Sequence, residues 1–147
     1  MKAKKTWIVA ADGARARLFA REGNTFVQVH DGVFEGGRDL AHDVGSDRPG
    51  RTHESSGPMR HSVEPKIDYR DKVEAAFLDG VIARLEAERR AGNLDRLVLV
   101  AAPEALGHLR RAMPEPLAET VVGTIPKDLT HAPLEQVVDT VTAAVPL

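Results

Sequence analysis

Residues 35–66 divide this chain into two parts with different sequence patterns, and this division constrains the fold more than any other feature. The segment from Glu35 to Lys66 shows neither a helical nor an alternating apolar period, and it contains five Gly and three Pro. An irregular insertion longer than about 12–15 residues is uncommon in a compact domain unless it is functional or disordered. We therefore predict a long polar loop over residues 35–66 and expect the function of the chain to lie there.

The residues before this loop have the pattern of three short strands. Trp7–Ala11 is a nearly continuous apolar run, as in a strand that is covered on both faces. A second strand is expected over Arg15–Arg21, and Thr25–Asp31 alternates apolar and polar residues as a third. The dipeptide Asp12-Gly13 is typical of a tight turn. This part of the chain is predicted to be an antiparallel meander.

The residues after the loop alternate between helical and strand patterns. A helix is expected from about Asp68, as its N-cap, to Gly92, and Glu86 and Arg90 in it are spaced as an i,i+4 pair. A buried strand over 94–102 follows, and Pro103 can open a short helix that ends at Pro114. The pattern then predicts a strand over 119–125 and a last helix, entered through residues 128–133, with its apolar stripe at Leu134, Val137, Val138 and Val141.

The predicted fold class is α/β. The order β-β-β-α-β-α-β-α fits one domain over residues 1–147, with a five-stranded mixed sheet, strand order 3-2-1-4-5, and helices on both faces. Ribonuclease-H-like domains and several domains of the translation machinery share this order, so the fold does not choose a function. The residues expected in the core are Ile8, Val9, Leu18, Val27, Phe77, Val81, Leu97, Leu99, Leu109, Val122 and Val138.

Composition excludes several function classes. The formal net charge of −2 gives no global reason to expect DNA or an anionic membrane as a partner. The chain has no Cys, which excludes a disulfide framework, a thiolate zinc site and a cysteine nucleophile. No apolar run reaches the ~18 residues of a membrane span, and the apolar stretch near the start is too short for a secretion signal. We expect a cytoplasmic protein of bacterial type without a cofactor or a metal ion.

The loop contains the candidate binding residues. Guanidinium groups beside hydroxyl and imidazole groups suit the phosphate oxygens of RNA or a nucleotide. Acidic residues such as Asp47 and Glu54 also lie in the segment, so the arginines could instead form internal ion pairs that fix the loop. The loop has no aromatic residue for stacking on bases. The candidate binding residues are Arg48, Arg51, His53, Ser55, Arg60 and His61.

A second candidate site consists of carboxylates outside the loop. A two-metal nuclease needs three or four carboxylates that converge on its metal ions, and Asp12, Glu74 and Glu104 are the best set that the sequence offers. Each also has a structural interpretation, because Asp12-Gly13 suits a type I′ turn and the two Glu suit a helix surface. We favour the turn at Asp12 and keep metal catalysis as the alternative. The interleaved Arg and Glu of the first helix are expected to form an ion-paired surface.

Five blocks of the sequence resemble one family of bacterial proteins over about residues 5–140. The blocks are WIVAADGARARLF from Trp7, DRPGR from Asp47, LVLVAAP from Leu97, LGHLR from Leu106 and KDLT from Lys127. They are similar to the host attachment family, whose members are described as required for attachment to host cells. The resemblance implies a fold like the middle domain of the archaeo-eukaryotic peptide release factors, and it brings no catalytic residues with it.

The resemblance also bears on the loop. Release-factor domains act through a Gly-Gly-Gln tip that enters the ribosome, whereas this chain has Gly36-Gly37-Arg38. Arg cannot reproduce the Gln amide, so peptidyl-tRNA hydrolysis is not expected, although docking onto RNA is compatible with this sequence. The prediction is a non-catalytic binding module that acts on RNA or the ribosome through the Arg/His loop. The alternative is a metal-dependent nuclease or phosphoesterase of ribonuclease-H-like fold.

Overall fold

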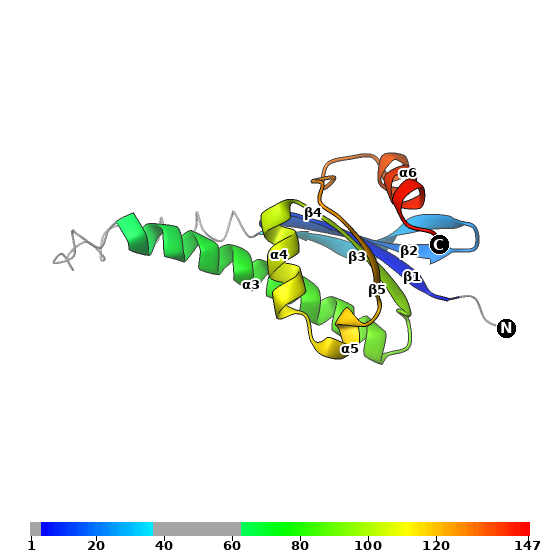
Figure 1. The fold of residues 1–147 in the computed structure, drawn as a ribbon, viewed down its shortest axis with the longest axis horizontal. Helices are drawn as coiled ribbons and strands as arrows, with labels where there is room; N and C mark the ends of the chain where they lie inside the picture. Colours follow the sequence, from blue (N-terminus) through cyan, green and yellow to red (C-terminus); the bar gives the residue numbers. More distant parts are fainter. Residues whose placement is uncertain (1–3, 37–62) are drawn as a thin grey trace.

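A computed structural model describes residues 4–36 and 63–147 and shows an α/β fold built on one five-stranded sheet (Figure 1). The elements in chain order are β1 (Thr6–Ala11), β2 (Arg15–Glu22), β3 (Thr25–Glu35), α3 (Val63–Arg90), β4 (Arg96–Ala101), α4 (Pro103–Ala112), α5 (Glu115–Ala118), β5 (Val121–Ile125) and α6 (Leu134–Ala144).

The sheet has the order β3-β2-β1-β4-β5, which confirms the predicted strand order. β1 pairs with β2 in antiparallel direction and with β4 in parallel direction, and β4 pairs with β5 in parallel direction. The sheet is therefore mixed, as expected from a meander followed by crossover helices. One consequence matters for function: the carboxyl ends of β1, β4 and β5 lie at the same edge of the sheet.

Helices cover both faces of the sheet, with α3, α4 and α5 on one face and α6 on the other (Figure 1). Alternate residues of β1 separate into the two cores, because Val9 packs toward α3 and α4 whereas Ile8 packs toward α6. The core residues correctly predicted as fully buried are Ile8, Val9, Leu18, Val81, Leu97, Leu99 and Leu109.

Four other residues expected in the core are less buried. Val27, Phe77 and Val138 are only partly buried. Val122 is 44% exposed, so its assignment to the core was wrong. The physical reason is an irregularity in β5. Leu97 and Val98 of β4 pair with Val121 and Gly123, which leaves Val122 as an extra residue at the outer edge of the sheet.

Several boundaries also differ from the prediction. β3 extends to Glu35, and its register against β2 shifts between Arg17 and Phe19. Gly32 allows this shift, because a Cβ there would lie 2.8 Å from Cβ of Val29 and 3.0 Å from Cβ of Leu18. The shift breaks the simple alternation of the strand, which is why sequence periodicity ended the strand too early.

The helix that follows the loop begins earlier than predicted. α3 starts at Val63, so Asp68 lies inside the helix and is not its N-cap. α3 ends as expected near Gly92, whose φ of 82° is left-handed. The amide of Gly92 donates to the carbonyl of Arg89 and that of Asn93 to the carbonyl of Glu88, which is the hydrogen-bond pattern of a Schellman motif. The short helix α5 was not predicted, because a turn of four residues carries no periodic signal.

The surface of α3 is ion-paired, as predicted. Arg89 and Arg90 both contact Glu86, at 2.8 and 3.1 Å. Arg84 bridges Glu88 on the same helix and Asp31 on β3. Among the helices of residues 63–147, none is both long enough and apolar enough to cross a membrane.

Candidate functional site

An open cleft of about 640 Å³ lies at the carboxyl ends of the parallel strands. The turn after β1 contributes Asp12 and Gly13, the segment after β4 contributes Ala102 to Ala105, and the segment after β5 contributes Asp128. α3 and α4 form the remaining walls, with Asp71, Glu74, Ala75, Leu78, Gly107, His108 and Arg111. In open α/β sheets, ligands bind in crevices at this edge of the sheet.

The cleft brings together the carboxylates of the alternative site. Asp12, Glu74 and Glu104 come from three separate segments, and all three line the cleft. Asp71 and Asp128 add two further carboxylates, whereas Arg111 is the one permanently charged base that lines the cleft among residues 4–36 and 69–147. The cleft therefore has an excess of negative charge. A catalytic role for these residues remains a prediction.

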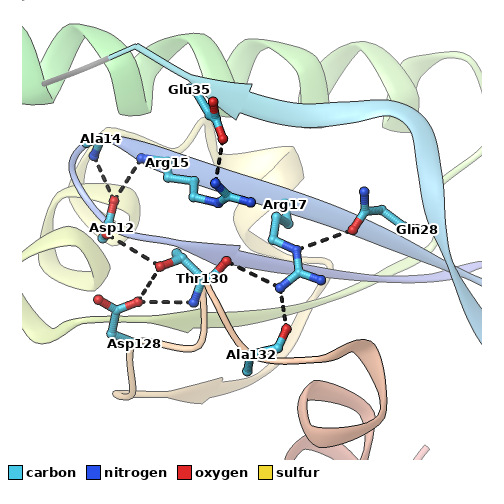
Figure 2. A network of polar contacts seen from close by, with 9 residues as sticks. All are labelled: Asp12, Ala14, Arg15, Arg17, Gln28, Glu35, Asp128, Thr130 and Ala132. Atoms are coloured by element: carbon cyan, nitrogen blue, oxygen red, sulfur yellow. Dashed lines mark hydrogen bonds and ion pairs between the residues drawn. The ribbon is translucent and has the colours of Figure 1, made fainter. Parts of the chain in front are cut away.

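The carboxylate of Asp12 organises the turn between β1 and β2. Its Oδ1 accepts hydrogen bonds from the amides of Ala14 and Arg15, both at 2.8 Å (Figure 2). This is an Asx-type turn, in which the side chain replaces a backbone acceptor. Neither Asp12 nor Gly13 has a positive φ, so the predicted type I′ turn is wrong. The loop between the strands is one residue longer than that turn requires.

Thr130 connects this turn to the segment after β5. Its hydroxyl lies 2.7 Å from Oδ1 of Asp128 and 3.5 Å from Oδ2 of Asp12, so it donates mainly to Asp128 (Figure 2). The amide of Thr130 also donates to Oδ1 of Asp128, at 3.1 Å. Thr130 is completely buried, and it holds Asp128 by two hydrogen bonds and lies beside the carboxylate of Asp12.

Arg17 holds the same segment against β2. Its Nη1 donates to the carbonyl of Ala132 at 2.5 Å and to that of Thr130 at 3.3 Å, and its Nε donates to Oε1 of Gln28 (Figure 2). The guanidinium also lies 4.9 Å from the ring centre of Phe19, a cation–π distance. Burial, followed by the nearby charge of Arg15, lowers the pKa of Arg17 from its ordinary value. Arg17 therefore has a structural role.

Gly13 brings the β1–β2 turn into direct contact with α3. A Cβ on Gly13 would lie 2.8 Å from Cδ and 3.0 Å from Oε1 of Glu74, which is too close for ordinary packing. The absence of a side chain at Gly13 therefore lets the Glu74 carboxylate lie against the turn. Nε of Arg70 lies 3.9 Å from Oε2 of Glu74, near the outer limit of an ion pair, and Glu74 also lines the cleft.

His108 lines the cleft from α4 and is tied to α3. Its Nε2 lies 2.8 Å from Oδ1 of Asp79, which connects the two helices on the cleft's flank. A carboxylate at this distance orients the imidazole ring. The sequence does not predict His108 as a site residue, and it appears there only within the LGHLR block. A single His on a helix does not indicate which part of the protein it faces.

The Arg/His-rich candidates lie outside the described residues. This applies to Arg48, Arg51, His53, Ser55, Arg60 and His61, to Gly37 and Arg38 of the Gly-Gly-Arg sequence, and to most of the loop predicted over residues 35–66. The described end of the loop is Gly36, whose amide donates to the carbonyl of Ala14 at 3.1 Å. The segment therefore leaves the sheet beside the turn that borders the cleft.

Sequence reasoning missed Asp71, Asp128, Thr130 and Arg111 as neighbours of the predicted carboxylates. One signal could have found part of this set: Asp12, Glu104 and Asp128 follow β1, β4 and β5, the three strands that run in the same direction, and the carboxyl ends of such strands meet at one edge. Asp71 and Arg111 could not be found this way, because their positions depend on how α3 and α4 pack.

Comparisons with known proteins identify the family. No curated protein matches the sequence. Residues 7–141, which are nearly the whole chain, match the family described as "Protein required for attachment to host cells". This match includes the turn after β1, the segments after β4 and β5, and both helices that border the cleft. The chain belongs to the host attachment family.

Proposed function

We propose that this host attachment domain is a non-catalytic binding module whose cleft accepts an organic cation, such as the amino or guanidinium group of a partner. The observation that carries the proposal is the composition of the cleft. Its lining includes Asp12, Asp71, Glu74, Glu104 and Asp128 against Arg111. A concave site lined by one sign of charge concentrates ligands of the opposite sign. Ammonium and guanidinium groups also supply several donors each, which suits carboxylate acceptors.

The arrangement of the carboxylates favours binding over metal catalysis. In residues 4–36 and 63–147, no three His, Asp or Glu side chains form a group that could hold a metal ion. The carboxylates are distributed along the walls, and Oδ1 of Asp12 is already occupied by two backbone amides. A ligand with separated positive charges matches such a distribution better than a single small ion does.

Titration calorimetry with spermidine tests the cleft. We expect wild-type protein to bind it and the double variant Glu74→Gln, Glu104→Gln to bind at least about tenfold more weakly, a loss of about 1.4 kcal/mol. The matched control is Glu115→Gln, Glu135→Gln, which removes the same charge from exposed positions on α5 and α6. Absence of spermidine binding, or an equal loss in the control, would contradict the proposal.

A specific observation also favours the enzymatic alternative, a metal-dependent nuclease or phosphoesterase. Asp12, Glu74 and Glu104 were grouped from the sequence as the carboxylates of such a site, and they line one cleft. Divalent-dependent hydrolysis of RNA or of an aryl phosphate tests it. Asp12→Asn should abolish that turnover while it retains the Oδ1 acceptor that holds the turn. No divalent-dependent hydrolysis by the wild-type protein would contradict this alternative.

RNA or ribosome binding through the Arg/His-rich segment is a further part of the proposal. The segment's arginines and hydroxyls support it, as does the resemblance of the family to release-factor domains. The acidic cleft repels phosphates, so RNA would be bound by Arg48 and Arg51 and not by the cleft. Co-sedimentation with ribosomes at low and moderate salt tests it. Arg48→Ala, Arg51→Ala should weaken binding and reduce the salt slope by about 1 for each lost phosphate contact.

The same double variant separates RNA binding from an internal structural role. If the two arginines hold the segment by ion pairs, their removal lowers the melting temperature and leaves RNA affinity unchanged. That result, or no co-sedimentation of the wild-type protein at either salt concentration, would contradict the RNA proposal. Glu74→Gln, Glu104→Gln is the control here, since it changes the cleft and is expected to leave ribosome binding intact.

A further inference from the structure

His108 is the one imidazole that lines the cleft among the residues that the structure describes. Its side chain is 22% exposed, and it lies on α4 one turn after Glu104 and one turn before Arg111. Imidazole is the side-chain group that ordinarily changes its charge between about pH 5 and 8. The net charge of the cleft therefore depends on whether His108 carries an extra proton.

Asp79 determines which ring nitrogen of His108 takes up that proton. Oδ1 of Asp79 lies 2.8 Å from Nε2 of His108. An ionised carboxylate only accepts hydrogen bonds, so Nε2 carries a hydrogen and donates it whether the ring is neutral or charged. Nδ1 is then the nitrogen that gains or loses a proton. Because the bond to Asp79 is kept in both states, protonation changes the charge of the ring and not the partner that holds it.

The charged groups around His108 come from every segment that borders the cleft. Beside Asp79, they are Asp71 and Glu74 of α3, Glu104 and Arg111 of α4, Asp12 of the turn after β1, and Asp128 of the segment after β5. A proton on Nδ1 adds a second positive charge to that of Arg111 and reduces the excess of negative charge. Charges in a concave, partly buried site are screened less than charges on an open surface. A protonated His108 therefore repels a cation in the cleft.

We propose that the cleft takes up its organic cation in exchange for a proton on His108, so that the affinity for the cation falls as the medium becomes acidic. This inference rests on the proposed cation-binding function and adds its regulation. The sign follows from thermodynamic linkage. The cation binds better when His108 is neutral, so cation binding releases a proton, and proton binding weakens the cation by the same factor.

Titration calorimetry with diguanidinobutane at about pH 6 and about pH 8 tests the exchange. Both guanidinium groups of this probe stay charged over the whole range, so the ligand itself does not titrate. We expect the dissociation constant of the wild-type protein to be at least about threefold higher at the lower pH. Titrations at about pH 6.5 in two buffers with different ionisation enthalpies should show that a fraction of a proton is released for each cation bound.

Two substitutions hold the charge at position 108 constant. His108→Gln keeps an amide that can donate to Asp79 but stays neutral, so its affinity should be high at both pH values and its proton release should disappear. His108→Arg is always charged, so its affinity should be low at both pH values. The matched control is His30→Gln, which removes an exposed imidazole of β3 outside the cleft and should retain the wild-type pH dependence. Circular dichroism confirms that each variant is folded.

The outcomes separate this exchange from the proposed function. An affinity that does not change with pH, or cation binding without proton release, would overturn the exchange and leave cation binding intact. A His108→Gln variant with the pH dependence of the wild type would do the same, because this variant retains all the carboxylates of the cleft and would assign the dependence to them. No binding of the probe at either pH would overturn both the exchange and the proposed function.

Discussion

The hydroxyl of Thr130 lies 3.5 Å from Oδ2 of Asp12, so a contact across 118 positions of sequence joins the turn after β1 to the segment after β5. The same hydroxyl donates to Asp128 at 2.7 Å. One buried side chain thus bonds to Asp128 and lies beside Asp12, two carboxylates that line the cleft.

Thr130→Val should destabilise the protein while it preserves the shape of the buried side chain. The variant removes a hydrogen bond to a carboxylate, and we expect the free energy of unfolding to fall by about 1–2 kcal/mol. Urea denaturation followed by the fluorescence of the buried Trp7 measures the change. The control is Thr142→Val, whose hydroxyl bonds only within α6 and is exposed, with an expected change within about 0.5 kcal/mol. Equal effects of the two variants would contradict the role given to Thr130.

Two glycine substitutions should change stability in opposite directions. Gly80 lies within α3 with nothing near the position of an added Cβ, so Gly80→Ala should raise the free energy of unfolding by about 0.5–1 kcal/mol. Gly92 has a φ of 82°, so Gly92→Ala should lower it by about 1–2 kcal/mol. Thermal denaturation of both variants shows whether each substitution raises or lowers the stability of the protein. A stabilising effect of Gly92→Ala would contradict the Schellman end of α3.

Gly123→Ala should destabilise the packing of α6 against β5. An added Cβ would lie 2.5 Å from Cγ2 of Val145, and such overpacking costs about 1–3 kcal/mol. The double variant Gly123→Ala, Val145→Ala makes room for the added methyl group. Urea denaturation should show a smaller loss for the double variant than the sum of the two single losses. Simple additivity would indicate that the two side chains do not meet.

Acid should weaken the charge network of α3 through Glu86. The hydrogen bond from Arg89, together with the charge of Arg89 and a second bond from Arg90, lowers the pKa of Glu86 from 4.5 to about 2. A lowered carboxyl pKa contributes stability above pH 4.5 that is lost as the pH falls toward 2. Glu86→Gln should therefore be less stable than the wild type at neutral pH, and the difference should vanish near pH 2. Denaturation midpoints of the wild type and of Glu86→Gln, measured from neutral pH down to about pH 2, show whether the two stabilities converge. A constant difference would show that the charge of Glu86 is not responsible.

The strands and the strand order followed from sequence because local patterns and connection rules determine them. Trp7–Ala11 reads as a buried strand in isolation, and the pattern of the second half requires crossover helices, so the order β3-β2-β1-β4-β5 could be predicted. The errors occurred where a local pattern is interrupted. The extra residue at Val122 and the register shift opposite Gly32 have no periodic signature.

The sequence by itself thus determined the fold class, the ion-paired surface of α3 and the choice of Asp12, Glu74 and Glu104 as a possible group. Only the tertiary structure decided that these carboxylates share one cleft with Asp128 and His108. The reason is that a cleft forms where segments distant in sequence meet. Its members are set by the packing of α3 and α4 and by single contacts such as that of Thr130, which no local pattern specifies.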